Sequence, residues 1–348
     1  MTSNGESPKS ANTGLMFKVL RIALGVGVTI ICFVYLFKQV DVSQLGSALA
    51  TFDLRFGVLS LALLSIGYGL RIYRWAVMLR SGAPHVATSR CVRPYLASIA
   101  LNNILPFRSG DAIRAFVFPK ALGISRSQSL ATLLFERLLD LLILVAILGF
   151  GVSAIGVENA PSWLITSLSF VAGASVVISA VSIFGAGFII RQIGKLEKQS
   201  WIIKTTVLHR LLEFIRYVFE YISVLAKDSR LIGVVALSIA IWCFEASVFA
   251  AIMAGLGDPV SVASSAFIAG LATIATLAPS SPGYFGPFHL AAFESYQLLF
   301  GESGRAAAMA VLSHAAIWAP TTFVGIIALC LDWGRFRLSD LRSASQER

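Results

Sequence analysis

Three charged residues interrupt a long apolar run, LLFERLLDLLILVAIL, that is otherwise suited to crossing a membrane. Glu136 and Asp140 are four residues apart and share a helical face, whereas Arg137 and Asp140 are three apart and can pair. An ionisable side chain near the bilayer centre costs roughly 2.5–3.5 kcal/mol, so these groups should face the protein interior. We expect them either to line a polar cavity or to form a structural ion pair. Acid–base catalysis is not expected, because no nucleophile lies nearby.

Two further arginines follow a proline. Arg108 and Arg114, with Asp111 between them, come just after Pro106. Two guanidinium groups at this spacing can bind a lipid phosphate through paired hydrogen bonds. The alternative is that both are loop arginines that reach towards the cytoplasmic interface. The sequence leaves both interpretations open.

Helix-breaking residues fall inside two apolar pieces, at residues 95–107 and 262–300. In lipid an exposed backbone N–H or C=O group costs several kcal/mol, so broken backbone must face protein or a water-filled cavity. Helix N-termini there also direct a positive dipole towards an anionic headgroup. We predict broken or re-entrant elements in both pieces, with simple kinks as the alternative. The breakers and their polar neighbours are Asn102, Asn103, Pro106, Gly110, Pro279, Ser280, Ser281, Pro282, Gly283, Gly286 and Pro287.

Isolated ionisable residues in the second half are weaker candidates. Glu245 and Glu294 lie in apolar stretches, where a lone glutamate is a functional candidate by default. His289 and His314 are single histidines, which are more often hydrogen-bonded interior residues than ligands. The four cysteines form no Cys-x-x-Cys pair, and no ATP-binding loop or hydrolase motif occurs. We therefore expect no cofactor and no metal.

The elements that must position these residues are mainly apolar helices. The chain is 57% hydrophobic and 13% charged, against about 25% charged residues in soluble domains, and its apolar runs of about 20 residues fit a bilayer. We predict an all-α integral membrane protein with six full transmembrane helices and the two broken elements; eight full spans are the alternative. The six helices are expected at 19–37, 56–79, 129–155, 162–190, 231–256 and 306–331.

The remaining chain divides into flanking segments. A polar tail at 1–14 is expected to be disordered, residues 15–332 to form one membrane domain, and 333–348 to be a basic cytoplasmic tail. Residues 191–230 combine apolar residues at helical spacing with many Lys and Arg residues. This pattern favours an amphipathic helix or helical hairpin in the membrane interface.

Basic residues predict the orientation. With both termini in the cytoplasm and each broken piece returning to the side it entered, only Lys38, Arg55 and Arg305 of the loop cations lie outside. This distribution follows the positive-inside rule of an inner membrane, and it accounts for the net charge of +10 without nucleic acid. The broken pieces then open to opposite sides, in inverted halves at about 54–190 and 231–332, as in secondary transporters.

The first broken piece and the charged run together resemble a known signature. The segment LNNILPFRSGDAIRAFVFPKALGISRSQSLATLLFERLLDLL is similar to the first signature of the lysylphosphatidylglycerol synthase transmembrane-region family, which includes the N-terminal flippase domain of the multiple peptide resistance factor. Pro279, Pro282, Gly283 and Gly286 match its Pro-x-x-Pro-Gly-x-x-Gly pattern, and the resemblance covers residues 15–332. It implies two inversely related membrane halves and a role in flipping or transporting lipids.

The chain departs from the family pattern at two places. The family usually has a glutamate after the Pro-Gly-x-x-Gly turn, where this chain has His289. A proton or headgroup role for that carboxylate is not carried over, unless Glu294 substitutes. Synthase members also carry an aminoacyltransferase domain after the membrane part, whereas this sequence ends at Arg348. We therefore do not expect the chain to make lysylphosphatidylglycerol.

Together these inferences predict a non-enzymatic lipid flippase or transporter of the bacterial inner membrane. The headgroup of an anionic phospholipid or a glycolipid would pass through a polar cavity between the broken elements, and a homo-oligomer is left open. The alternatives are a membrane enzyme acting on a lipid- or polyprenyl-linked substrate, and a scaffold for glycolipid or polysaccharide assembly. The expected lipid-contacting residues are Asn102, Asn103, Pro106, Arg108, Gly110, Asp111, Arg114, Glu136, Arg137, Asp140, Pro279, Ser280, Ser281, Pro282, Gly283, Gly286, His289 and Glu294.

Overall fold

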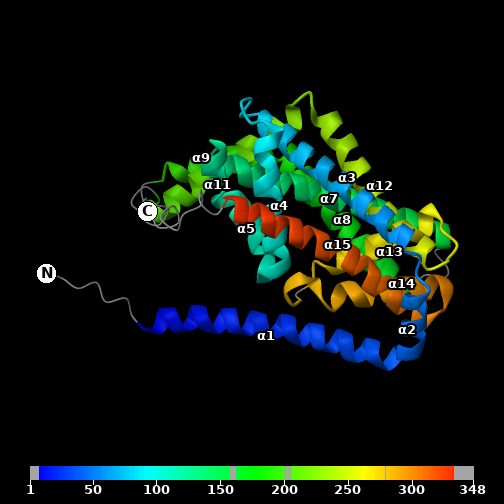
Figure 1. Cartoon of the computed structure of the whole chain (residues 1–348). Coiled ribbons are helices and arrows are strands. Elements are labelled where there is room, and N and C mark those ends of the chain that lie inside the picture. The colour runs from blue at the N-terminus through cyan, green and yellow to red at the C-terminus, as the bar shows by residue number, and fades with distance from the viewer. Residues whose placement is uncertain (1–7, 157–161, 200–201, 203–204, 279, 333–348) are drawn as a thin grey trace.

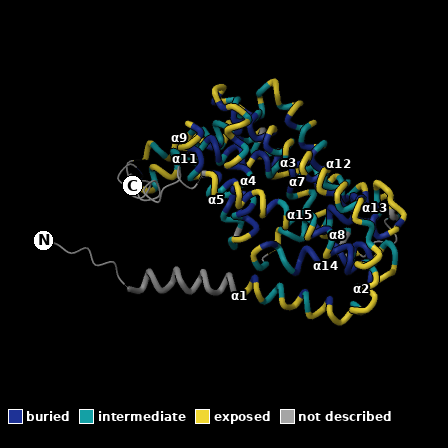
Figure 2. Tube along the Cα trace, in the orientation of Figure 1, coloured by how far each residue is buried: buried dark blue, intermediate teal, exposed yellow. Residues whose placement is uncertain are grey.

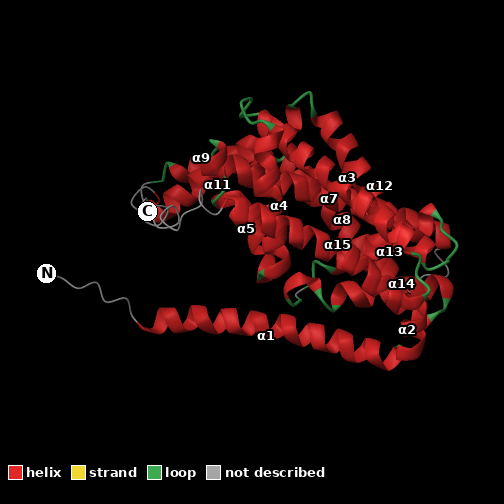
Figure 3. Ribbon diagram, in the orientation of Figure 1, coloured by secondary structure: helices red, strands yellow, loops and turns green. Residues whose placement is uncertain are grey.

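The computed structural model describes residues 8–156, 162–199, 202, 205–278 and 280–332, and every regular element in these ranges is helical (Figure 3). The all-α class is therefore confirmed. The first half contains α1 (Pro8–Gln39), α2 (Val42–Ala50), α3 (Leu54–Arg80), α4 (Thr88–Ile104), the short 3-10 helix η1 (Pro106–Arg108), α5 (Ser109–Phe116), α6 (Pro119–Leu122), α7 (Arg126–Ile155) and α8 (Ser162–Phe184). The rest contains α9 (Ala186–Glu197), α11 (Thr206–Lys227), α12 (Leu231–Gly255), α13 (Val262–Ala275), the 3-10 helix η3 (Pro282–Tyr284), α14 (Pro287–Phe300) and α15 (Ser303–Asp332).

Four of the described helices are long and apolar enough to cross a membrane, and they indicate a multi-pass membrane protein. A fifth span is present if Ala23–Gln39 is counted together with α2, which is bent from it by 87°. α7 is a single helix of 30 residues but is not among these candidates, so the predicted count of six is not established. The four are Leu54–Arg80, Ile165–Ser182, Leu231–Gly255 and Ser303–Leu331.

The N-terminal helix differs from the expected tail. α1 begins at Pro8, inside the stretch predicted to be disordered, and proline is well tolerated in a first helical turn because its missing N–H has no partner there. Residues 1–7 and 333–348 lie outside the described residues. In Figure 1 α1 runs along one side of the helical body, and α2 then leads the chain into that body. Asp41 caps α2, accepting a hydrogen bond from the Ser43 N–H at 2.8 Å.

Equivalent helices of the two halves make equivalent contacts. α3 packs along α12, and α4 packs on α15 as α13 packs on α7. Likewise α5 contacts α7 as α14 contacts α15. Each broken element is thus packed against a long helix of the other half, and the two breaks contact each other. The opposite orientation of the halves in a membrane stays a prediction.

Buried residues form an interior, and many exposed residues on the helices around it are apolar (Figure 2). One apolar core lies among α3, α4, α7, α11 and α12, where Trp75 and Leu79 have no exposed surface. Large apolar side chains such as Phe170, Ile232 and Phe323 point outwards and are 75%, 83% and 67% exposed, as expected for helices that face acyl chains. The amphipathic stretch at 191–230 contributes to α9 and α11, which pack on each other as a hairpin.

Both predicted breaks interrupt helical backbone. α4 ends at Ile104, Leu105 is extended, and η1 leads into α5. Gly110 is required at this turn, because a Cβ there would lie 1.9 Å from the Ser98 carbonyl oxygen. The second break separates α13 from α14 and includes Gly286, whose φ of 94° favours glycine. Whether these elements re-enter the bilayer stays a prediction.

Candidate functional site

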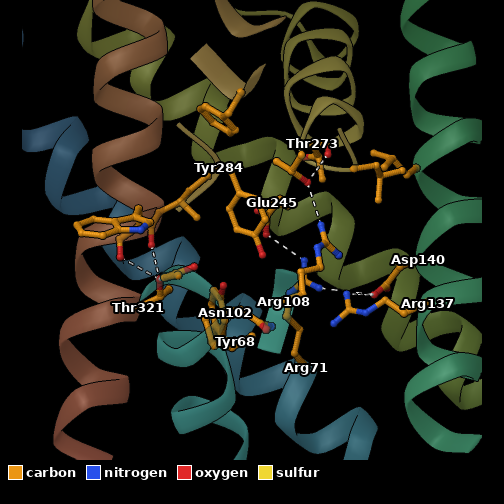
Figure 4. Close-up of a pocket in the computed structure, with 18 of the residues that line it drawn as sticks. Tyr68, Arg71, Asn102, Arg108, Arg137, Asp140, Glu245, Thr273, Tyr284 and Thr321 are labelled. Atoms are coloured by element: carbon orange, nitrogen blue, oxygen red, sulfur yellow. Dashed lines mark hydrogen bonds and ion pairs between the residues drawn. The ribbon is translucent and has the colours of Figure 1, made fainter. Parts of the chain in front are cut away.

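A polar cavity lies where the two breaks meet, enclosed by α3, α4, α7, α12 and α15 (Figure 4). Its volume is about 300 Å³. Besides apolar side chains, it is lined by charged and polar residues from eight elements and the turn after α13. These are Tyr68, Arg71, Tyr95, Asn102, Asn103, Arg108, Arg137, Asp140, Trp242, Glu245, Thr273, Thr276, Tyr284, His314, Trp318 and Thr321.

A buried network of charges forms one wall of this cavity. Arg74 donates to Asp140 at 2.7 Å, and both side chains are almost fully buried. Arg71 reaches Glu245 on α12 at 3.2 Å, and the Asp140 carboxylate at 3.9 Å. Arg137 lies 3.7 Å from Asp140 and is the more exposed member, at 34%. The network explains how a helix with three charges can be buried, since each charge has an opposite partner.

Glu136 occupies the buried side of the same network. Its side chain has no exposed surface and pairs with Arg114 at 3.1 Å. The Arg114 guanidinium also lies over the rings of Tyr95 and Trp75, 4.7 and 5.3 Å from their centroids. Both interpretations of the charged run therefore apply: Arg137 and Asp140 line the cavity, whereas Glu136 belongs to a structural ion pair.

The expected clamp of two arginines is not formed. Arg114 is 1% exposed and lies outside the cavity lining, because Glu136 holds it inside the body. Arg108 lines the cavity, where its Nη2 donates to the Thr276 hydroxyl at 3.1 Å and its guanidinium lies 5.3 Å from the Tyr284 ring centroid. Of these two arginines, only Arg108 lines a cavity.

Amide side chains hold the first break in place. Asn102 donates to Asp111 and accepts from the Asp111 backbone N–H, both at 3.0 Å. Asn103 donates to the hydroxyls of Thr321 and Thr322 on α15, at 3.1 and 2.9 Å. Both asparagines also contribute to the cavity lining, so they position the break and add polar surface.

A second cavity of about 480 Å³ lies next to the first and reaches α1. Pro106 lines it, and so do Leu24 and Gly25 of α1. From the second break it is lined by Ser280, Ser281, Pro282 and Gly283. Pro279 lies outside the described residues.

α1 is hydrogen-bonded to the second break. The Thr29 hydroxyl accepts from the Ser281 N–H at 3.1 Å and donates to the Phe285 carbonyl at 2.9 Å. A Cβ on Gly25 would lie 2.7 Å from the Ser280 carbonyl oxygen, so this close approach requires glycine. α1 therefore forms one side of the second cavity.

Three second-half candidates do not line either cavity. His289 is buried beside His314, with ring centroids 4.5 Å apart, but it lines neither cavity. Glu294 and Gly286 are also absent from both linings. His314 does line the first cavity, and its Nε2 lies 2.8 Å from the Gly283 carbonyl oxygen.

Sequence reasoning missed the two arginines that neutralise the charged run. The orientation predicted from the sequence counts Arg71 and Arg74 among the cytoplasmic cations, because they lie near the end of an apolar run. The structure places them inside the body, on the α3 face towards α7. A usable signal existed: two arginines three residues apart on one helix match two carboxylates four apart on another.

Comparisons with known proteins identify the family of the chain. A family model described as the lysylphosphatidylglycerol synthase TM region matches residues 22–325. Glycosyltransferase AglD of Haloferax volcanii is 25% identical over 336 residues, covering 88% of this chain and 53% of AglD. The chain thus spans about half the length of that relative. No solved structure matches the chain. The family match covers most of the sequence, and the chain belongs to the lysylphosphatidylglycerol synthase transmembrane-region family.

Proposed function

We propose that the chain transports a lipid between the two leaflets of the bacterial inner membrane. The headgroup passes through the polar cavity between the two breaks, while the acyl chains stay in the bilayer. The observation that carries this proposal is that both breaks and a balanced charge network line one cavity inside a multi-pass membrane body. Such a cavity can replace the water that a polar headgroup loses in hydrocarbon.

Family membership supports a role in handling lipids or glycolipids. The name of the relative AglD is that of a glycosyltransferase, which makes a glycan-bearing lipid a candidate substrate beside an anionic phospholipid. Both termini are proposed to be cytoplasmic and the halves inverted, because this arrangement keeps most loop cations on the cytoplasmic side.

A membrane enzyme is the second candidate, and the name of that relative is the observation that favours it. Against it, each charged carboxylate at the first cavity is already paired: Asp140 with Arg74, and Glu245 with Arg71. A general base needs a free carboxylate within hydrogen-bond reach of substrate. We therefore propose transport without chemistry for this chain.

Purified protein in vesicles tests the proposal. Fluorescent phosphatidylglycerol and fluorescent glucosylceramide are added to both leaflets, and dithionite then destroys the label that is exposed outside. Transport is expected to expose more label than the outer leaflet contains, and Glu245→Gln is expected to slow it. Asp53→Asn, at an exposed ion pair, is the matched control.

The same vesicles separate the two candidates. Wild-type protein that is folded and moves neither lipid would rule out the transporter. Conversion of either lipid to a new species on thin-layer chromatography would favour the enzyme.

A further inference from the structure

The two breaks share one local design. Each is a three-residue 3-10 helix that begins with proline, Pro106–Arg108 in η1 and Pro282–Tyr284 in η3. Each ends in a left-handed residue, Arg108 with a φ of 51° and Tyr284 with a φ of 62°. Among the described residues these two are the only non-glycine residues with positive φ. This backbone is strained for a residue with a Cβ, and such strain is retained where the surrounding structure fixes it, often at functional sites.

These two equivalent residues contact each other at the centre of the body (Figure 4). The Arg108 guanidinium lies 5.3 Å from the Tyr284 ring centroid, and its Nη2 donates to the Thr276 hydroxyl at 3.1 Å. Both partners come from the second break or the turn before it. One side chain of the first break therefore holds two groups of the second.

Arg108 differs from the other arginines around the first cavity because its partners are neutral. Arg71 and Arg137 each lie within 4.0 Å of at least two carboxylates. In the described part of the chain no carboxylate comes that close to Arg108. A guanidinium that is half-buried against a hydroxyl and a ring face has lost water without gaining an anion. Of the three arginines that line the first cavity, Arg108 is therefore the one whose charge is not neutralised by a carboxylate in contact with it.

The same contact separates the two cavities. Cavities of about 300 and 480 Å³ lie on either side of it. The residues that line both are Asn102, Arg108, Thr276, Leu277 and Tyr284. A headgroup that moves between the cavities must therefore pass the Arg108–Tyr284 contact.

We propose that Arg108 binds the phosphate group of the transported lipid, and that the Tyr284 ring occupies Arg108 when no lipid is bound. This deepens the proposed function and rests on it. A phosphate oxygen carries full charge and binds guanidinium more strongly than a ring face does. Phosphate binding therefore displaces Tyr284 and opens the passage between the cavities, whereas a lipid without phosphate cannot do so.

Lipid binding in detergent tests this assignment without needing transport. Native mass spectrometry compares phosphatidylglycerol with glucosylceramide on wild type, Arg108→Lys and Arg108→Asn, since asparagine tolerates the left-handed backbone. Arg108→Asn is expected to bind phosphatidylglycerol about ten-fold or more weakly, with glucosylceramide unchanged and Arg108→Lys intermediate. The exposed Arg55 provides the matched control, Arg55→Asn. Equal phosphatidylglycerol binding by Arg108→Asn and wild type would overturn the proposal.

Tyr284 provides an independent second variant. Tyr284→Asn keeps the backbone conformation but removes the ring that competes with phosphate, so phosphatidylglycerol binding is expected to strengthen several-fold. Tyr284→Phe keeps the ring and is expected to stay closer to wild type than Tyr284→Asn. Weaker binding by Tyr284→Asn, with its helical content and size-exclusion profile unchanged, would contradict a competing role for the ring.

Two further experiments distinguish a lipid phosphate from free phosphate, and this inference from the proposed function. Inorganic phosphate at the same concentration should leave phosphatidylglycerol bound. If phosphate displaces the lipid, Arg108 binds free anions and not specifically lipids. In the vesicle assay, transport of phosphatidylglycerol that is unaffected in Arg108→Asn overturns this inference but leaves the transporter standing. Selective binding through Arg108 without transport of any lipid has the opposite meaning: the inference holds and the proposed function fails.

Discussion

Removal of one carboxylate from the charge network should destabilise the protein strongly. In Asp140→Asn the side chain keeps its shape and one oxygen acceptor but loses its charge. Arg74 has no exposed surface and lies 2.7 Å from Asp140. In this variant it keeps the Ser238 hydroxyl at 2.7 Å, but the nearest described carboxylate is then Glu136, at 3.7 Å. At an effective dielectric constant of 20, two charges about 4 Å apart interact by about 4 kcal/mol. Breaking a buried pair by removing one partner costs about 3–5 kcal/mol, so we expect a loss near 3–4 kcal/mol.

Unfolding by sodium dodecyl sulfate in detergent micelles, followed by circular dichroism, measures this loss. Asp53→Asn is the matched control: its pair with Arg55 is exposed, and asparagine preserves the N-cap of α3, so the change should cost about 0–1 kcal/mol. The double variant Arg74→Met, Asp140→Leu should lose less stability than Asp140→Asn, because no charge is left alone. If Asp140→Asn costs no more than Asp53→Asn, the network is hydrated and our account of its burial is wrong.

Three predictions concern the breaks and the topology. Gly110→Ala should abolish the monodisperse peak in size-exclusion chromatography, because its Cβ would lie 1.9 Å from a carbonyl of α4, whereas Gly27→Ala has open space and should behave as wild type. Thr29→Val should cost about 1–3 kcal/mol by unpairing backbone of the second break, and unchanged hydrogen exchange there would contradict this. With native cysteines removed, His85→Cys should label only from the cytoplasmic side and the exposed Val260→Cys only from outside; labelling of both from one side would refute the inverted arrangement.

The positions of the breaks could be predicted from the local sequence. Prolines and glycines disrupt helices through their own backbone chemistry, so η1 and η3 lie where the sequence predicts them. The need for burial of Glu136 and Asp140 was also predictable, because charges in an apolar helix have few other places to go. These features depend on residues close together in the chain.

Partnerships across the fold could not be predicted in this way. Arg74 and Asp140 are 66 residues apart, and Arg71 and Glu245 are 174 apart. Near the end of an apolar helix, an arginine that snorkels to the interface and one that turns inwards have the same local sequence. Arg114 shows the reverse difficulty: its spacing from Arg108 suits a phosphate clamp, but the turn at Gly110 directs it towards Glu136.

Most residues of the charge network lie in the first half of the chain, which affects the order in which their ion pairs can form during synthesis. Arg74, Arg114, Glu136 and Asp140 all precede α8, so their ion pairs can form before the second half has been made. α7 can therefore enter the membrane with its charges already neutralised by its own half. The Arg71–Glu245 pair forms only when α12 arrives and packs along α3. A nascent chain can thus neutralise the charges of α7 first, and its polar centre is complete only when α12 has packed.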